Sequence, residues 1–349
     1  MATLRAANSL ERPPARTGRN REDHMTIKTL LVTVAGIGLA AAPALAATWD
    51  LSSEYPAGSL QGQTADFFAK AVAEKTGGDI EVTVHHGAAL GYKSVDHFDA
   101  VGDGALQAAS SAFVFWTGID PIFQLSSLPF LAPTSADVHD LYELAKPEYE
   151  KVLEDNNQML LLATPWPSSG LWGNKAFTSL ADLEGVKVRT YDVASTETIK
   201  NAGAFPIQIS WADVPAQLST NAIDAVLTSP NGGVGVQMWE LQSNFTNVNY
   251  ASSLQAIHLN LDAWDDLSEE QRAAVKEAAE DAEDFGWGLL MEATAKDFDT
   301  MRENGMTVTE EIPAEFSQAL TEAAQPFIDE WIADTGERAQ SIMNAYQSR

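Results

Sequence analysis

Two blocks of alternating strand and helix patterns, followed by one long helical stretch without proline, constrain the fold of this chain most strongly. In the first block, Ile80, Val82 and Val84 alternate with polar residues as in a half-buried strand, after a helical apolar pattern over residues 61–75. Strand–helix–strand order of this kind is typical of a mostly parallel sheet covered by helices. The pattern restarts at Met159, which predicts two α/β lobes with a ligand cleft between them.

The predicted elements are short and end at turn residues, mainly glycine. Strands are predicted over residues 48–53, 79–86, 105–110, 159–163, 186–189 and 225–227. Helices are predicted over residues 61–75, 95–102, 180–183, 195–202 and 214–220.

The long helical stretch begins at Ser268–Gln271, which has the capping-box form S-x-x-Q. Apolar residues then recur at helical spacing, without proline, to about Arg302. A helix of this length exceeds the usual globular range and can span both lobes. Pro313 opens a last helical region, predicted over residues 314–347.

The amino end has the pattern of an export signal. Lys28 precedes an apolar run from Leu30 to Ala42, and Ala44–Ala46 supplies an A-x-A cleavage site. The run is too short and too rich in alanine and glycine for a good membrane anchor, which is the alternative. Because five arginines precede Met25 in a segment atypical of such signals, we expect translation to start at Met25.

Composition excludes several classes of function. The 349 residues include 21 Lys and Arg against 49 Asp and Glu, a net charge of −28, which would repel nucleic acid. The absence of cysteine excludes disulfides, thiolate metal sites and thiol nucleophiles. No nucleotide-binding, hydrolase or metalloprotease motif is present, and the histidines are unclustered or, at His85 and His86, on opposite faces of a strand. We therefore expect no catalytic residue, no metal and no cofactor.

One cation stands out, because Arg189 ends a predicted strand in a chain with few basic residues. Strand ends open into the crevice of an α/β sheet, and arginine is suited to bidentate capture of a carboxylate. On the sequence alone, an ion pair with one of the many acids is an equally good interpretation. Trp166, Trp172 and Trp211 lie in loop-like segments near strand ends, where either aromatic core or ligand contact is possible.

Five stretches in order give the chain its resemblance to a known family. It resembles the DctP-type solute receptors of tripartite ATP-independent periplasmic (TRAP) transporters over nearly all of residues 47–347. The stretches that carry the resemblance are the helix with its T-G-G end at residues 65–78, the turn at residues 86–91, L-P-F-L at residues 128–131, N-K…L-A-D-L-E-G-V-K-V-R at residues 174–189, and Q-L-S-T-N-A-I-D at residues 217–224.

The resemblance implies an α/β, two-lobed fold like the type II periplasmic binding proteins, with a long helix spanning both lobes. Residues 1–46 would be the cleaved signal peptide, 47–163 mainly the first lobe, 164–260 mainly the second, and 261–349 the long helix and C-terminal helices. It further implies a periplasmic receptor, not an enzyme, that closes on a small organic acid and delivers it to the TRAP membrane subunits. We expect it to act as a monomer.

The resemblance also assigns site residues. Arg189 falls on the family's carboxylate-binding arginine, and Trp211 on an aromatic position that packs on the ligand. Ser169 stands where many members have a second arginine, and Thr228 where a polar asparagine is frequent. The other expected ligand contacts are Tyr55, Phe113 and Trp166. With one fixed cation and more apolar surface, the pocket suits a monocarboxylate, which puts a C4-dicarboxylate ligand in doubt.

Three other functional classes remain as alternatives. An exported α/β hydrolase would need a nucleophile and a base, and the sequence displays no Ser/His arrangement. A periplasmic binding protein of the ABC type would differ in its transporter partners. An acidic structural or adhesion protein would be expected to show repeats or an exposed apolar stripe, and neither is visible.

We predict cleavage between Ala46 and Ala47. Mass spectrometry of protein taken from the periplasm of the native host should give an amino terminus at or next to Ala47. An intact terminus at Met1 or Met25 in that fraction would contradict the prediction.

Overall fold

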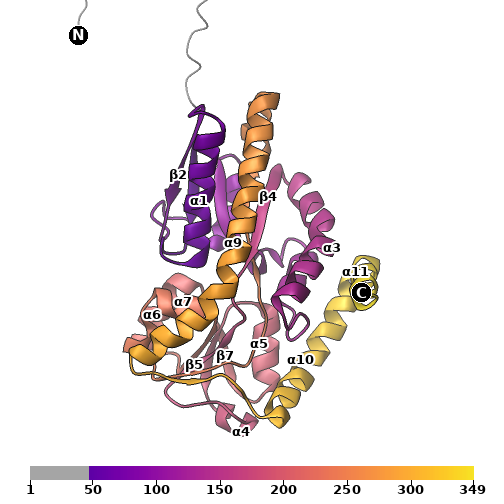
Figure 1. Ribbon diagram of the computed structural model, residues 1–349. Helices are drawn as coiled ribbons and strands as arrows, with labels where there is room; N and C mark the ends of the chain where they lie inside the picture. Colours follow the sequence, from indigo (N-terminus) through magenta and orange to yellow (C-terminus); the bar gives the residue numbers. More distant parts are fainter. Residues whose placement is uncertain (1–46) are drawn as a thin grey trace, which may run out of the picture. The chain divides into compact units, whose positions relative to one another are not determined.

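The computed structural model describes residues 47–349, with only the backbone at 291 and 292 (Figure 1). The predicted signal peptide and start site therefore lie outside the described residues. Within those residues, two separate sheets are each covered by helices, which confirms the predicted α/β class. No helix of this part is both long and apolar enough to cross a membrane.

The first sheet has five strands in the order β2-β1-β3-β10-β4. Its strands are β1 (Ala47–Ser53), β2 (Ile80–His85), β3 (Ala108–Ala112), β4 (Gln158–Pro165) and β10 (Leu254–Asn260). β1 pairs in parallel with β2 and β3, whereas β10 runs antiparallel between β3 and β4. The helices of this part, here called the first lobe, are α1 (Leu60–Lys75), α2 (Ser94–Gly102), η1 (Phe113–Trp116), η2 (Pro121–Ser127) and α3 (Ser135–Glu154).

The second sheet has six strands in the order β11-β9-β5-β8-β6-β7. Its strands are β5 (Gly170–Gly173), β6 (Lys187–Thr190), β7 (Phe205–Gln208), β8 (Ala225–Thr228), β9 (Asn244–Thr246) and β11 (Thr307–Thr309). The helices of this second lobe are α4 (Leu180–Leu183), α5 (Val193–Asn201), η3 (Trp211–Asp213), α6 (Val214–Ser219), α7 (Pro230–Gly235) and η4 (Met238–Glu240). The parallel strands β6 and β8 end on the side that faces the first lobe.

The chain passes from one sheet to the other between β4 and β5 and again between β9 and β10. β10 was not anticipated from the sequence: it lies within the range expected to be mainly second lobe, yet it pairs in the first sheet. All seven of its residues are buried, because β3 and β4 flank it and both faces are covered. Such a strand has no alternating pattern to reveal it.

α9 (Glu269–Glu303) is the predicted long helix, and Figure 1 shows it running along both lobes. Its capping box is formed, with the Ser268 Oγ accepting from the Gln271 N–H at 3.2 Å and the Gln271 Oε1 accepting from the Ser268 N–H at 3.0 Å. Gly286 is required by close packing, since a Cβ there would lie 2.5 Å from the Thr164 Cγ2 of β4. α9 thereby approaches the first sheet more closely than any larger residue would allow.

The C-terminal helical region predicted over residues 314–347 forms two helices. α10 (Ala314–Thr335) ends at Gly336, whose φ of 67° interrupts the helical path before α11 (Glu337–Gln347). α8 (Leu261–Asp265) precedes α9. α10 packs on α5 of the second lobe and α11 on α3 of the first, so this region also connects the two lobes.

Two fully buried histidines of the first lobe share one hydrogen-bond network. The Ser111 Oγ lies 2.9 Å from the His97 Nδ1 and 2.9 Å from the His258 Nε2. The His97 Nε2 is 3.0 Å from the Ser52 Oγ, and the His258 Nδ1 is 2.7 Å from the Gln158 Oε1. Burial lowers the pKa of His97 to about 4 and lowers that of His258 as well. Both side chains are therefore neutral in the folded protein at pH 7.

This network should make the fold sensitive to mild acid. A histidine with a pKa near 6.5 when unfolded and about 4 when folded contributes stability that is complete above pH 6.5 and is lost as the pH falls toward 4. For His97 this loss is about 3 kcal/mol. The variant His97→Gln should flatten the dependence of unfolding free energy on pH between 6.5 and 4, measured by chemical denaturation. The exposed His139→Gln is the control, and an equally steep profile in both variants would contradict the prediction.

Candidate functional site

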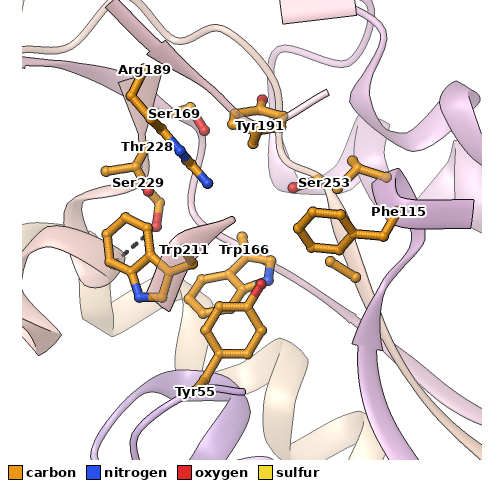
Figure 2. Close-up of a pocket in the computed structure, with 13 residues that line it drawn as sticks. Tyr55, Phe115, Trp166, Ser169, Arg189, Tyr191, Trp211, Thr228, Ser229 and Ser253 are labelled. Atoms are coloured by element: carbon orange, nitrogen blue, oxygen red, sulfur yellow. Dashed lines mark hydrogen bonds between the residues drawn. The ribbon is translucent and has the colours of Figure 1, made fainter. Parts of the chain in front are cut away.

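A pocket lies between the lobes at the ends of the parallel strands of the second sheet (Figure 2). It encloses about 460 Å³ of unoccupied space, including its opening to solvent. Thirteen residues from both lobes and their connections line this interlobe pocket: Tyr55, Ala112, Val114, Phe115, Trp166, Ser169, Arg189, Tyr191, Trp211, Thr228, Ser229, Gly232 and Ser253. The location agrees with the rule that ligands bind beyond the carboxyl ends of strands in open α/β sheets.

Arg189, near the end of β6, is the central polar group of the pocket. Its side chain is 3% exposed, and its Nε and Nη1 donate to the carbonyl oxygens of Ile209 and Leu227, each at 3.2 Å. It forms no ion pair among the side chains that the structure describes, and burial lowers the pKa of its guanidinium to about 10. The site therefore holds a fixed, desolvated positive charge that a bound anion could neutralise.

Aromatic rings surround this cation (Figure 2). The guanidinium carbon lies 5.5 Å from the ring centre of Trp211 and 5.7 Å from that of Tyr191, within the range of cation–π attraction. The rings of Trp166 and Tyr55 pack with their centres 4.8 Å apart and their planes tilted by 57°, and the Trp166 Nε1 donates to the Gln255 Oε1 at 3.2 Å. These contacts hold the walls of the pocket in place before any ligand arrives.

The remaining polar groups of the pocket are hydroxyls. Thr228 ends β8, and Ser229 follows it as the N-cap of α7, where its Oγ accepts from the Gly232 N–H at 3.1 Å. Ser169 precedes β5, and Ser253 precedes β10. Hydroxyl groups both donate and accept, so this wall can bind uncharged oxygen or nitrogen groups of a ligand.

The structure brings together six of the seven residues that the sequence predicted as ligand contacts. These are Tyr55, Trp166, Ser169, Arg189, Trp211 and Thr228. Their proximity is a fact of the fold, and their contact with a ligand stays a prediction. Trp172, the third tryptophan that we considered, packs in the core against Phe245.

Phe113 does not line the pocket. Its side chain is fully buried in the core of the first lobe, 4.7 Å from the Tyr149 ring and 5.3 Å from the Trp116 ring. The reason is local geometry: β3 ends at Ala112, and the chain turns into the 3₁₀ helix η1. As a result the next two residues, Val114 and Phe115, line the pocket instead.

Seven residues of the pocket were not among the predicted contacts, and the larger or polar side chains among them are those of Phe115, Tyr191, Ser229 and Ser253. Tyr191 could have been found, because it lies two residues after Arg189 and the strand period is two. Ser229 directly follows a predicted contact residue. Nothing in the local pattern marks Ser253, which reaches the pocket through the connection between β9 and β10.

Behind the pocket, Asn231 of α7 links three helices. Its Oδ1 accepts from the Leu60 N–H at the start of α1 at 3.0 Å, and its Nδ2 donates to the Asp297 Oδ2 of α9 at 3.2 Å. Asp297 is 5% exposed, and burial raises its pKa to about 6. A side chain of the second lobe thus caps a helix of the first, next to pocket residues Ser229 and Gly232.

Comparison with known proteins gives a consistent family of relatives. The family model "Bacterial extracellular solute-binding protein, family 7" matches residues 51–334. A solved extracytoplasmic solute receptor of Bordetella pertussis that binds pyroglutamic acid is 28% identical, with a TM-score of 0.84, over 86% of this chain and 100% of that one. The ectoine-binding periplasmic protein of Halomonas elongata is 26% identical over 91% of this chain and 95% of its own. The C4-dicarboxylate-binding periplasmic protein of Rhodobacter capsulatus is 26% identical over 82% of this chain and 86% of its own.

The raised pKa of Asp297 predicts a stabilising substitution. In the folded protein the Asp297 carboxyl group keeps its proton up to about pH 6, whereas in the unfolded chain it loses the proton near pH 3.8. The unfolding free energy therefore falls as the pH rises through this interval. Asp297→Asn should therefore raise the unfolding free energy at pH 7 by about 1–3 kcal/mol and give no gain below pH 4. Chemical denaturation at pH 7 and below pH 4 measures the gain in unfolding free energy, and the exposed Asp284→Asn on the same helix is the control. An equal gain at both would contradict it.

Proposed function

The chain belongs to family 7 of the bacterial extracellular solute-binding proteins, and from this premise we propose that it is the receptor of a TRAP transporter for a small monocarboxylate with an uncharged body. It would be exported to the periplasm by the amino-terminal signal, capture the acid between its lobes, and present it to the membrane subunits of the transporter. It would perform no chemical step on the ligand.

The observation that carries the proposal is the buried guanidinium of Arg189. A desolvated charge without an ion-pair partner among the described side chains is costly, and a carboxylate is the anion whose two oxygens match the guanidinium geometry. Nε and Nη1 are fixed by carbonyl oxygens, so the side chain is already oriented toward the cavity. A ligand carboxylate would recover the desolvation energy that folding spent on this group.

The lining supports a ligand with a single charge. Arg189 is the one charged side chain among the thirteen residues that line the pocket. A second carboxylate, or the ammonium group of an amino acid, would be buried without an opposite charge, which is strongly unfavourable. Hydroxyls and aromatic rings instead suit a small body with neutral polar groups, held against the rings of Trp166 and Trp211.

The ligands of the relatives can be judged against this chemistry. Pyroglutamate, the ligand of the Bordetella receptor, joins one carboxylate to a small ring whose amide is neutral, and it matches the pocket. A C4-dicarboxylate has a second anionic group, and ectoine has a cationic ring, for which the lining offers no counter-charge. We therefore propose a pyroglutamate-like acid as the ligand class.

The hydrolase alternative gains one candidate from the structure that the sequence did not reveal. Ser111 lies between His97 and His258, which resembles a nucleophile beside a base. However, all three side chains are fully buried within the first lobe, and none lines the interlobe pocket. This network has no access to a substrate, so the receptor is the better-supported function.

A thermal-shift panel tests the proposed function. L-pyroglutamate and small 2-oxo and aromatic monocarboxylates should raise the melting temperature, because a ligand that binds only the native state stabilises it by about 2.7 kcal/mol at a hundred times its Kd. Succinate, malate, L-proline and L-glutamate should have little effect. If succinate stabilised the protein as strongly as any monocarboxylate, the single-charge argument would be wrong.

Arg189 provides the matched control. Arg189→Ala should lower the affinity for the stabilising acid by about 2–5 kcal/mol, which is roughly 30-fold to several-thousand-fold by calorimetry. Arg189→Lys should also weaken binding, because an ammonium cannot reproduce the paired hydrogen bonds, and Trp211→Ala should cost about 1–3 kcal/mol. The exposed Arg349→Ala should bind like the wild type. An Arg189→Ala affinity within threefold of wild type would overturn the assignment.

A further inference from the structure

Glu54 is a buried acid at the mouth of the pocket. It directly follows β1, precedes the pocket residue Tyr55, and is 4% exposed. Its Oε2 accepts a hydrogen bond from the Ser94 N–H at 3.0 Å, and its Oε1 accepts one from the Ala212 N–H at 3.2 Å. Both oxygens of the carboxylate are thus used by backbone donors, and neither contacts the cavity.

The two donors belong to different lobes. Ser94 is the first residue of α2 in the first lobe, and Ala212 lies in η3 of the second lobe, directly before α6. N–H groups at the start of a helix have no partner within the helix and favour a negative charge. The Glu54 carboxylate therefore accepts hydrogen bonds from an N–H group at the start of a helix in each lobe. The bond to Ala212 can exist only while the lobes are together.

Glu54 is also connected to two aromatic walls of the pocket, to one through its neighbour in the chain and to the other through its hydrogen bond to Ala212. Tyr55, its direct neighbour, packs on Trp166, and Ala212 directly follows Trp211, whose ring lies against the Arg189 guanidinium. Breaking the bond between Glu54 and Ala212 would remove the hydrogen bond from the first lobe to the residue that follows Trp211. Glu54 can therefore position two aromatic walls without contacting the ligand.

A second contact crosses the mouth beside it, between the Lys93 Nζ and the Asp213 Oδ2 at 3.1 Å. These two side chains are 38% and 50% exposed, so solvent and salt screen their attraction. Hydrogen bonds from backbone N–H groups to a buried carboxylate are short-range and protected from solvent. Of these two contacts, the hydrogen bond of Glu54 is the one expected to hold the Trp211 segment against the first lobe.

We propose that Glu54 is a closure latch, a positioning residue that keeps the lobes shut over the bound acid and so sets how long the ligand stays. The proposal rests on the receptor function proposed above. Because the latch forms after the ligand has entered, its loss should speed ligand release and leave ligand entry nearly unchanged. The effect should persist at high salt, unlike that of the Lys93–Asp213 pair.

The kinetic test uses L-pyroglutamate as the probe and the change in tryptophan fluorescence on binding as the signal. In stopped-flow measurements Glu54→Ala should raise the dissociation rate 10- to 100-fold, with an association rate within threefold of wild type. Glu54→Gln, which keeps one acceptor oxygen, should give a smaller increase. Glu81→Ala is the matched control, since Glu81 is an exposed acid at the opposite end of the paired strand β2.

The structural test exploits the absence of cysteine in the sequence. Spin labels are attached at two exposed positions, Ala89→Cys in the first lobe and Thr220→Cys in the second. Pulsed electron paramagnetic resonance then measures the distance between the labels, which reports the separation of the lobes. At saturating L-pyroglutamate the wild type should show one short distance, and Glu54→Ala should retain a population at longer distances. This readout also shows whether the Glu54→Ala variant is folded.

Each outcome decides the proposal. If the wild type binds and Glu54→Ala releases the probe within twofold of the wild-type rate, the latch is wrong and the receptor function stands. If L-pyroglutamate fails to bind, the monocarboxylate that gives the largest thermal shift replaces it in both tests. If no acid of the panel binds, the proposed function fails, and the spin-label distances of the ligand-free protein decide the fate of the latch. Identical distance distributions in the wild type and in Glu54→Ala would overturn the latch. Loss of the short distance in the variant would support it.

Discussion

A guanidinium buried without an ion-pair partner in the described chain is the constraint on which the pocket depends. Arg189 belongs to a protein with 49 acidic residues and 21 basic ones, so a carboxylate partner would be easy to supply. The fold instead fixes this cation with two carbonyl oxygens and two aromatic rings, leaving its charge uncancelled. Burying this charge is costly, and an anion bound beside it would offset that cost, which is the basis of the proposal that the site takes acids.

The architecture places this cation where two lobes meet. Strands β6 and β8 deliver Arg189 and Thr228 to one edge of the second sheet, and the loop after β1 brings Tyr55 from the first. The sheets are connected through the two strand crossings and α9, whose close approach to the first sheet depends on Gly286. Opposite walls of the pocket are thus carried by different lobes, so their contact depends on closure.

Buried acids have a separate role from the many exposed ones. Glu54 and Asp297 lie around the pocket, and each is hydrogen-bonded to a group that helps to join the lobes. Because Asp297 is desolvated, its charge costs stability at neutral pH, whereas the carboxylate of Glu54 has a backbone donor on each oxygen. The exposed acids, by contrast, can be read as a solvated surface.

The sequence by itself determined the local elements and singled out Arg189, the one charged residue that lines the pocket. The period of two in β2, the capping box of α9 and the strand-end position of Arg189 are encoded by neighbouring residues, because local backbone geometry decides which side chains share a face. Apart from the wider family resemblance, no such local signal exists for contacts between distant segments.

Only the tertiary structure decided the rest. It placed β10 in the first sheet, turned Phe113 into the core while Phe115 lines the pocket, and brought Ser253 into the pocket that Arg189 lines. It also joined Glu54 to Ala212, 158 residues further along the chain. These contacts depend on how the lobes pack and close. Packing is a property of the whole chain, and no stretch of residues records it locally.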